Sequence, residues 1–257
     1  MAKHNLIINK EKCIGCMKCI NDCVSGNLSL DKDNKVQVNG SSCLYCGHCE
    51  AICPNNAIVL DGFEDETIEY EEQTRLDPNE LLMAVRTRRS IRKFIDKPIE
   101  ENIVNQILEV GRITPTAVNS QKIRYIILGD KQDELEASCV KYFRRLSKLG
   151  KPFSKAVRNL NFSDNFFFKG APLVIVIVAD KVNGCLAASN MALMAESFGL
   201  GVLYSGMFTS LANIRRSIKK TLKLKSKEKV ATTLVIGYTN IKYKRTVKRE
   251  KLNVTKL

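Results

Sequence analysis

The sequence predicts an α+β protein in which a small cysteine-rich domain precedes a larger body of helices and strands. Eight of the ten cysteines fall within the first 60 residues, in two runs with the same spacing. An acidic stretch follows these runs, and helical patterns then alternate with short apolar runs of strand length. We therefore expect a cysteine-rich domain over residues 1–60, a linker over 61–76 and the body over 77–257.

The composition is that of a globular protein. The chain has 257 residues, of which 44% are hydrophobic, enough for a core in one large or two unequal domains. It contains no run of eighteen apolar residues, and its beginning, MAKHNLIINKEKC, lacks the apolar stretch of a signal peptide. We therefore expect a cytoplasmic protein with no membrane partner. In that compartment, ten cysteines favour metal ligation over disulfide bonds.

The formal net charge of +14 is unevenly distributed along the chain. Residues 1–75 carry 7 Lys+Arg against 12 Asp+Glu, a net of −5, and the remainder carries 34 against 15, a net of +19. Such a basic body could bind phosphate groups, an acidic partner or nucleic acid, or be a solvated basic surface. Nucleic-acid binding is not favoured, because no zinc finger, basic zipper or aromatic RNA-binding signature is present.

Several segments show the patterns of regular structure. In the small domain NLIIN and KVQVN are strand-like, and in the linker seven of the twelve residues in DGFEDETIEYEE are acidic. A helix is expected next, with Asp77 as N-cap, Pro78 at the first position and Glu80 at capping-box spacing. Its apolar face consists of Leu81, Leu82 and Val85.

The rest of the body alternates between helical and strand patterns. The expected helices span residues 98–110, with Gly111 as a stop, 133–149, 184–198 and the basic segment ANIRRSIKKTLKL. The expected strands are IRYIILG, PLVIVIVAD and VATTLVIGY. The continuous apolar run PLVIVIVAD predicts a sheet that is covered on both faces.

Both cysteine runs have the spacing C-x2-C-x2-C-x3-C, which is typical of [4Fe–4S] clusters. The first run is Cys13, Cys16, Cys19 and Cys23, and the second is Cys43, Cys46, Cys49 and Cys53. In two-cluster proteins of this type, the last cysteine of each run binds the other cluster. We therefore predict that Cys53 completes the site of the first run and Cys23 that of the second. Zinc is the alternative, but it needs only C-x2-C pairs. The two remaining cysteines, Cys139 and Cys185, lie in helical segments and are expected to be small core residues.

Two clusters pass single electrons, so the body needs a group that also handles electron pairs, and flavin is the commonest. GLGVLYSG is not a Rossmann motif, because Tyr204 stands at the third glycine position, and no Walker A sequence is present. In RTRRSIRKF, residues 86–94, the side chains of Arg88, Ser90 and Arg92 alternate and would point one way on an extended segment. Such cations suit the phosphate and the anionic reduced ring of FMN. The alternative is a solvated helix end.

The two parts of the chain resemble two known families. Residues 1–60 resemble bacterial two-cluster ferredoxins; Pro54 fits their pattern after the second run, whereas Val24 departs from it after the first. Residues 78–250 resemble the nitroreductase-like FMN family in RTRRSIRKF, TPTAVNSQ, AASNMALMAESFGLG, YSGMF and the terminal IGY. The combination resembles the ferredoxin-like nitroreductases of anaerobic bacteria. This resemblance implies a central, mostly antiparallel sheet flanked by helices.

The resemblance also implies a homodimer with two FMN sites at the interface, each built from both subunits. It places Arg88, Arg89, Ser90 and Arg92 along the phosphate, ribityl and pyrimidine parts of FMN, and Asn119 at the isoalloxazine edge. It places the loop Tyr204, Ser205, Gly206 and Met207 along the ring, and Arg245 with Lys244 at the phosphate. The alternatives are a turn-forming Asn119, a hinge at Gly206 and a surface charge at Arg245. No residue is expected to act as an obligatory acid or base.

Three departures from the family concern the shape of the substrate pocket. Gln121 is followed by Lys122 and Ile123 rather than Pro and an aromatic residue, Thr239 replaces a common Pro, and the chain has no Trp. The three phenylalanines at 166–168 could stack on an aromatic substrate or belong to the core.

The function expected from these features is that of an FMN-dependent oxidoreductase. It takes electrons from an external low-potential donor, such as a ferredoxin, and delivers them through two [4Fe–4S] clusters and FMN to a small organic acceptor. A nitroaromatic or a quinone would fit. The alternatives are a flavin reductase that uses NAD(P)H, with the clusters as electron outlet, and a non-catalytic redox sensor or electron carrier.

Overall fold

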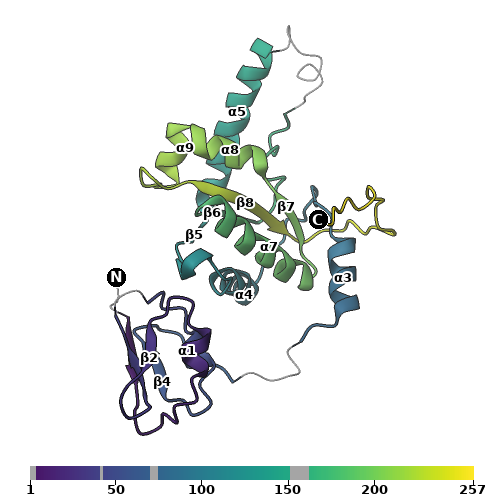
Figure 1. The fold of residues 1–257 in the computed structure, drawn as a ribbon. Coiled ribbons are helices and arrows are strands. Elements are labelled where there is room, and N and C mark those ends of the chain that lie inside the picture. The colour runs from purple at the N-terminus through teal and green to yellow at the C-terminus, as the bar shows by residue number, and fades with distance from the viewer. Residues whose placement is uncertain (1–3, 41–42, 70–74, 151–161) are drawn as a thin grey trace. The chain divides into compact units, whose positions relative to one another are not determined.

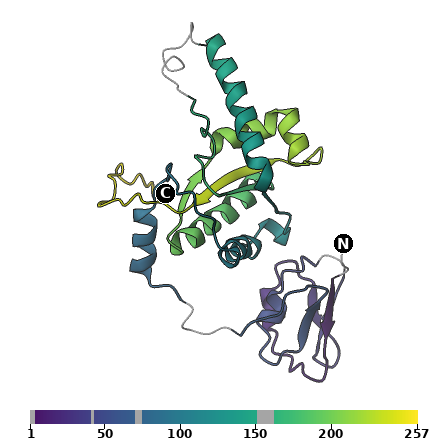
Figure 2. The same cartoon turned by 180° about the vertical axis from the view of Figure 1, so that it is seen from behind.

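The computed structural model describes residues 4–40, 43–69, 75–150 and 162–257, without the side chains of 148–150. The chain separates into two compact units (Figures 1 and 2): Met1–Arg75 with Thr116–Ser120, and Leu76–Pro115 with Gln121–Leu257. No helix among the described residues is both long and apolar enough to cross a bilayer.

The first unit is built from two short antiparallel strand pairs and two short helices. Strand β1 (Asn5–Ile8) pairs with β4 (Ile58–Asp61), and β2 (Leu28–Leu30) pairs with β3 (Val36–Val38). The segments NLIIN and KVQVN are thus strands as predicted, whereas β2 and β4 were not predicted. Helices α1 (Lys18–Asp22) and α2 (His48–Ala51) each begin inside a cysteine run. Each follows a residue in the left-handed conformation, Met17 (φ 61°) and Gly47 (φ 76°).

The second unit is centred on one antiparallel sheet with the strand order β5-β6-β8-β7. These strands are β5 (Arg124–Ile127), β6 (Leu173–Val178), β7 (Gly201–Tyr204) and β8 (Val230–Gly237). All six residues of β6 are buried, because alternate side chains enter two separate apolar clusters. The prediction of an α+β fold around a sheet covered on both faces is confirmed.

Helices cover both faces of this sheet (Figure 1). Helices α4 (Glu101–Arg112) and α7 (Lys181–Ser197) pack on one face, where Ile107 and Met191 are fully buried. The other face is covered by α5 (Gln132–Gly150), α8 (Gly206–Ile214) and α9 (Arg216–Thr221). Two predictions require correction. The segment ANIRRSIKKTLKL is not one helix, because the extended conformation of Arg215 separates α8 from α9. Of the two body cysteines expected in the core, Cys139 is 1% exposed but Cys185 lies on the surface.

Gly111 does not end its helix, as the sequence suggested, but lies inside α4. A Cβ atom at this position would lie 2.7 Å from the Tyr125 hydroxyl oxygen and 2.8 Å from the Met191 sulfur. The glycine is therefore required by close packing of α4 against β5 and α7 rather than by termination.

Helix α3 (Pro78–Thr87) begins as predicted, since the Asp77 side chain accepts hydrogen bonds from the N–H groups of Asn79 and Glu80. None of its residues is buried. Leu82 and Val85 are 48% and 51% exposed, so a single chain leaves the apolar face of this helix in water.

Candidate functional site

The eight cysteines of the two runs surround two cavities in the first unit. The first cavity is lined by Cys13, Cys16, Cys19 and Cys53, and the second by Cys23, Cys43, Cys46 and Cys49. The last cysteine of each run therefore lies with the first three cysteines of the other run. This is the exchange that the spacing predicts for two [4Fe–4S] clusters.

Backbone N–H groups point at the cysteine sulfurs in both cavities. At the first cavity Val36 donates to Cys13 Sγ at 3.4 Å, and Ala57 donates to Cys53 Sγ at 3.2 Å. The equivalent bonds at the second cavity run from Asn27 to Cys23 Sγ and from Tyr45 to Cys43 Sγ, each at 3.4 Å. Such donors stabilise thiolates and the sulfurs of an iron–sulfur cluster. The donor set therefore fits a cluster in each cavity.

The thiols of these cavities would lose their protons on binding iron. Burial raises the pKa of Cys49 to about 11 and raises the pKa of Cys19 above its usual value. Ligation requires thiolates, so binding is coupled to proton release. Among the described residues, no three His, Cys, Asp or Glu side chains converge on one metal ion. In a [4Fe–4S] cluster each thiolate binds a different iron, so its cysteines lie farther apart than the ligands of a single ion.

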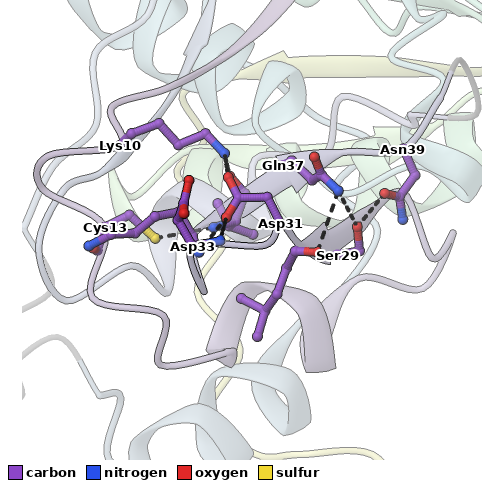
Figure 3. Close-up of polar contacts among 10 residues, drawn as sticks. Lys10, Cys13, Ser29, Asp31, Asp33, Gln37 and Asn39 are labelled. Carbon is purple, nitrogen blue, oxygen red and sulfur yellow. Dashed lines mark hydrogen bonds and ion pairs between the residues drawn. The ribbon is translucent and has the colours of Figure 1, made fainter.

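The β2–β3 hairpin holds the loop of Cys13 in place (Figure 3). Lys10 Nζ forms an ion pair with Asp31 Oδ2 at 2.5 Å, and Lys35 Nζ donates to the carbonyl oxygen of Cys13. The Lys10 ammonium, with the N–H group of Lys35, lowers the pKa of the Asp31 carboxyl. Asp31 also accepts the N–H group of Asp33, which closes the turn between the two strands.

In the second unit, the arginine segment is extended and lies along strand β7. Ser90 forms a parallel bridge with Val202, and the N–H group of Ile91 donates to Val202 O at 3.0 Å. Ile91 is 7% exposed, whereas Ser90 and Arg92 are exposed, so the side chains alternate as the pattern predicts. Gly201 makes this packing possible, because a Cβ atom there would lie 2.8 Å from Ile91 Cβ.

Arg88 is held by a carboxylate that the sequence analysis did not single out. Its Nε lies 2.8 Å from Glu196 Oε2 on α7, and the two side chains are 22% and 23% exposed. Burial raises the pKa of Glu196, against the opposing effect of the Arg88 charge. Burial also raises the pKa of Tyr204, and the nearby Arg88 guanidinium opposes this shift. The structure thus brings Arg88 and Tyr204 together.

A cleft of ≈ 370 Å³ in the second unit is lined by Arg88, Arg89, Glu196 and Tyr243, among others. Arg89 donates to the carbonyl oxygens of Arg86 and Arg88 through one terminal nitrogen. Its Nε is buried and meets no partner within the described part of the chain. Two guanidinium groups, one with an unpaired donor, fit the phosphate of a nucleotide such as FMN.

Tyr204–Met207 is not the loop that the sequence suggested, because Tyr204 ends β7 and Gly206 begins α8. Ser205 precedes the helix, but its hydroxyl donates to Phe167 O at 3.0 Å instead of capping it. The first turn of α8 therefore has no side-chain cap, and both Gly206 and Met207 are exposed there. An uncapped helix start can bind a group that carries negative charge.

Three further residues predicted to contact FMN do not line this cleft, namely Asn119, Lys244 and Arg245. Asn119 belongs to the first unit, where its Nδ2 donates to Leu44 O at 3.2 Å and to Tyr45 O at 2.7 Å. Its positive φ of 50° agrees with a turn-forming role. Lys244 and Arg245 are exposed in the segment that follows Tyr243.

Two of the three phenylalanines at 166–168 lie in the core, which is the second of the two roles that the sequence left open. Phe167 and Phe168 are each 1% exposed, and Phe166 is partly buried. The buried carboxylate of Glu136 on α5 accepts the N–H groups of Phe167 and Phe168, both at 2.7 Å. Burial raises the pKa of Glu136, and the two N–H donors oppose this shift. No sequence pattern pointed to Glu136, because its partners are 31 and 32 residues away.

Comparison with known proteins gives matches for both units. The family model described as "Nitroreductase family" matches residues 85–238, and that described as "4Fe-4S dicluster domain" matches residues 12–57. A protein of Methanothermobacter thermautotrophicus named for NADH dehydrogenase or NAD(P)H nitroreductase is 26% identical over 141 residues. That match covers 50% of this chain and 62% of the relative, which is less than two thirds of its length. An uncharacterized ferredoxin of Methanocaldococcus jannaschii is 36% identical over 58 residues, covering 21% of this chain and 75% of the relative.

A solved structure shows the same fold as the second unit. The nitroreductase with bound FMN from Desulfitobacterium hafniense superposes with a TM-score of 0.56 at 21% identity, covering 69% of this chain and 99% of that one. At this identity the similarity shows the fold of the matched part alone.

Proposed function

This chain belongs to the nitroreductase family, and from that premise we propose that it is an FMN-dependent oxidoreductase supplied with electrons through two [4Fe–4S] clusters. The membership confirms the resemblance found in the arginine motif. The observation that carries the proposal is the presence, in one chain, of two four-cysteine cavities and of this family's fold. The electrons come from an external low-potential donor and reach a small organic acceptor such as a nitroaromatic or a quinone.

The residues of the second unit supply positive charge and position. FMN, when bound, supplies the exchange between one-electron and two-electron chemistry. Arg88 and Arg89 hold its phosphate and ribityl parts, with Glu196 fixing the Arg88 guanidinium. Ser90, Arg92, Asn119, Lys244, Arg245 and the start of α8 remain proposed contacts of the same cofactor. A fixed positive charge near a flavin stabilises its anionic reduced form, so no acid or base is required.

We further propose that the protein is a homodimer whose interface completes the FMN site. The exposed apolar face of α3 supports this, since contiguous apolar surface of this kind marks interaction sites. This helix also reaches the arginine cleft, because Ala84 and Thr87 line it. A second subunit that covers α3 would therefore also border the cofactor.

Anaerobic reconstitution tests the proposal. The full chain, supplied with iron, sulfide and FMN, should bind about eight irons and one flavin per chain. It should then reduce a nitroaromatic or a quinone in repeated turnovers with a chemically reduced ferredoxin as donor. A chain that binds no iron or no flavin contradicts the proposal. Bound cofactors without turnover would instead identify a redox sensor or an electron carrier.

A second candidate donor is NAD(P)H. It is favoured by the 24% identity over 144 residues to the FMN reductase [NAD(P)H] of Bacillus subtilis, a match covering 50% of this chain and 54% of the relative. The clusters would then serve as the electron outlet. Anaerobic mixing with NADH or NADPH separates the two directions, because flavin bleaching within the turnover time occurs only if the pyridine nucleotide is the donor.

A further inference from the structure

The side chain of Asn27 is buried in the first unit without a partner. It is 3% exposed, and neither its Oδ1 nor its Nδ2 meets a hydrogen-bond partner among the residues that the structure describes. Buried amides are nearly always paired, so an orphaned one requires an explanation. Asn27 lines the second cavity, together with its four cysteines. The group that fills this cavity is therefore the partner available to the amide.

The sequence repeat provides an internal comparison for this residue. Asn27 follows Cys23 by four positions, and Ala57 follows Cys53 by four positions. The two backbones behave alike, because each residue donates its N–H group to the sulfur of the preceding cysteine, at 3.4 and 3.2 Å. Ala57 lines the first cavity just as Asn27 lines the second. At this pair of positions, only the second cavity has a side chain able to donate.

The backbone of Asn27 is fixed on both sides. Its N–H group is bound to Cys23 Sγ, and its carbonyl oxygen accepts the N–H group of Asn39 at 2.8 Å. Asn39 is in turn bound through its side chain to Ser29 of the β2–β3 hairpin (Figure 3). Little freedom remains for the amide except rotation about its own side-chain bonds, so it is organised in advance for a ligand in the cavity.

We propose that the Asn27 amide donates a hydrogen bond to a sulfur of the [4Fe–4S] cluster in the second cavity and raises its reduction potential above that of the first. This inference rests on the proposed function, because it requires a cluster in each cavity. Reduction adds negative charge to a cluster. A donor to sulfur stabilises the more negative state and shifts the potential upward.

The difference in burial between the two sets of cysteines also favours a higher reduction potential at the second cavity. Cys13 and Cys19 of the first cavity are 7% and 8% exposed, whereas the cysteines of the second cavity, Cys49 included, are only partly buried or exposed. A less solvated site resists added charge, which lowers its potential. The Lys35 ammonium beside Cys13 works against this difference, but it is partly solvated and therefore screened.

The order of potentials gives the two clusters different roles. With a cluster bound in each cavity, an electron would move downhill from the first cluster to the second, oxidising the one and reducing the other. The second cluster is then the outlet.

The test is a redox titration, followed by EPR spectroscopy, of the full chain loaded anaerobically with iron, sulfide and FMN. In the unchanged protein we expect two distinct midpoint potentials. Asn27→Ala should shift the one-electron equilibrium of the higher-potential cluster about tenfold toward oxidation, which corresponds to ~59 mV. The lower potential should not move. Ala57→Asn, the reciprocal change, should raise the lower potential.

Control variants distinguish a loss of the Asn27 hydrogen bond from a general loss of structure or of iron. Asn5→Ala, on an exposed position of β1, should leave both potentials unchanged. Asn27→Leu keeps the branching of the side chain at Cγ without its polar groups, and it replaces the alanine variant if that variant loses iron. Coupling between the reduced higher-potential cluster and asparagine labelled with ¹⁵N only at the side-chain amide, measured by pulsed EPR, gives a readout without any mutation; this label leaves out the backbone nitrogen that already binds Cys23 Sγ. An unmoved higher potential in an iron-replete variant, or absent coupling, overturns the inference. A chain that takes up no iron overturns the proposed function instead.

Discussion

The two units of this chain build their sites in opposite ways. In the first unit, the eight predicted sulfur ligands all lie in the segment from Cys13 to Cys53, and their spacing predicts the type of cluster that they hold. In the second unit, the cleft gathers residues from Ala84 to Tyr243, contributed by α3, the arginine segment, α7 and the C-terminal segment among others. A site formed by a local repeat can be predicted from the sequence. A site assembled from distant segments cannot, because its geometry depends on how each contributing element packs.

The largest effect of a single substitution is expected at a predicted cluster ligand of the first unit, because no other side chain can replace its bond to iron. Cys53→Ala should remove about half of the iron, because one of two clusters loses its fourth thiolate. Iron and sulfide counts on the reconstituted chain measure this loss. Cys185→Ala, at an exposed cysteine outside both cavities, should keep all of the iron.

Double variants sharpen the test of the exchanged ligand. If Cys53 belongs with Cys13, the variant lacking both should lose no more iron than either single variant. The variant lacking Cys43 and Cys53 should lose nearly all of it. The reverse result would show that each run holds its own cluster.

The next largest effect concerns the cleft of the second unit. Arg88→Ala should weaken FMN binding about 10- to 100-fold, since a hydrogen bond between charged groups contributes roughly 1.5–3 kcal/mol. Iron content should not change, because no cysteine ligand is involved. Flavin retained on gel filtration, compared with the exposed neighbour variant Arg86→Ala, measures the effect. An Arg88→Ala protein that retains its FMN would show the assignment to be wrong.

The contrast between a site formed by a local repeat and one assembled from distant segments also explains which features could be predicted from the sequence. The cysteine sets, the cap at Asp77 and the buried strand β6 follow from local spacing or composition, and the sequence was sufficient for them. The partner of Arg88 was not predictable, because Glu196 meets it only after α7 has packed against the sheet. Gly111 was misread as a helix stop because its neighbours Tyr125 and Met191 come from other elements. Asn27 did have a local signal, the mismatch with Ala57 in the repeat, although only burial shows that it matters.

A smaller effect on both stability and FMN affinity is expected from a substitution that disturbs the packing beneath the arginine segment. Gly201→Ala places a methyl group against Ile91, and overpacking of this kind costs about 1–3 kcal/mol. Because Ile91 supports the arginines, both the free energy of unfolding and the FMN affinity should fall together. Urea unfolding and flavin titration measure the two. Gly40→Ala, where an added Cβ meets no atom within 4 Å, is the matched control.

The smallest effect should come from Glu136, whose buried carboxylate binds backbone N–H groups rather than a predicted cofactor contact. Burial raises its pKa in the folded state, so at pH values between the ordinary and the raised pKa the folded state binds more protons than the unfolded state. The free energy of unfolding should therefore fall as the pH rises through that window. Above the window the carboxylate is ionised in both states, and the loss is complete.

Glu136→Gln removes the titration and should abolish this pH-dependent slope. It should also lower stability by roughly 1 kcal/mol, because one amide oxygen cannot replace two carboxylate oxygens as acceptors for Phe167 and Phe168. Urea unfolding from just above the ordinary Glu pKa to neutral pH measures both effects. Glu134→Gln, at an exposed carboxylate on the same helix, should keep the slope. If the slope persists in Glu136→Gln, the titrating group lies elsewhere. The second unit would then depend on a charge that its local sequence does not reveal.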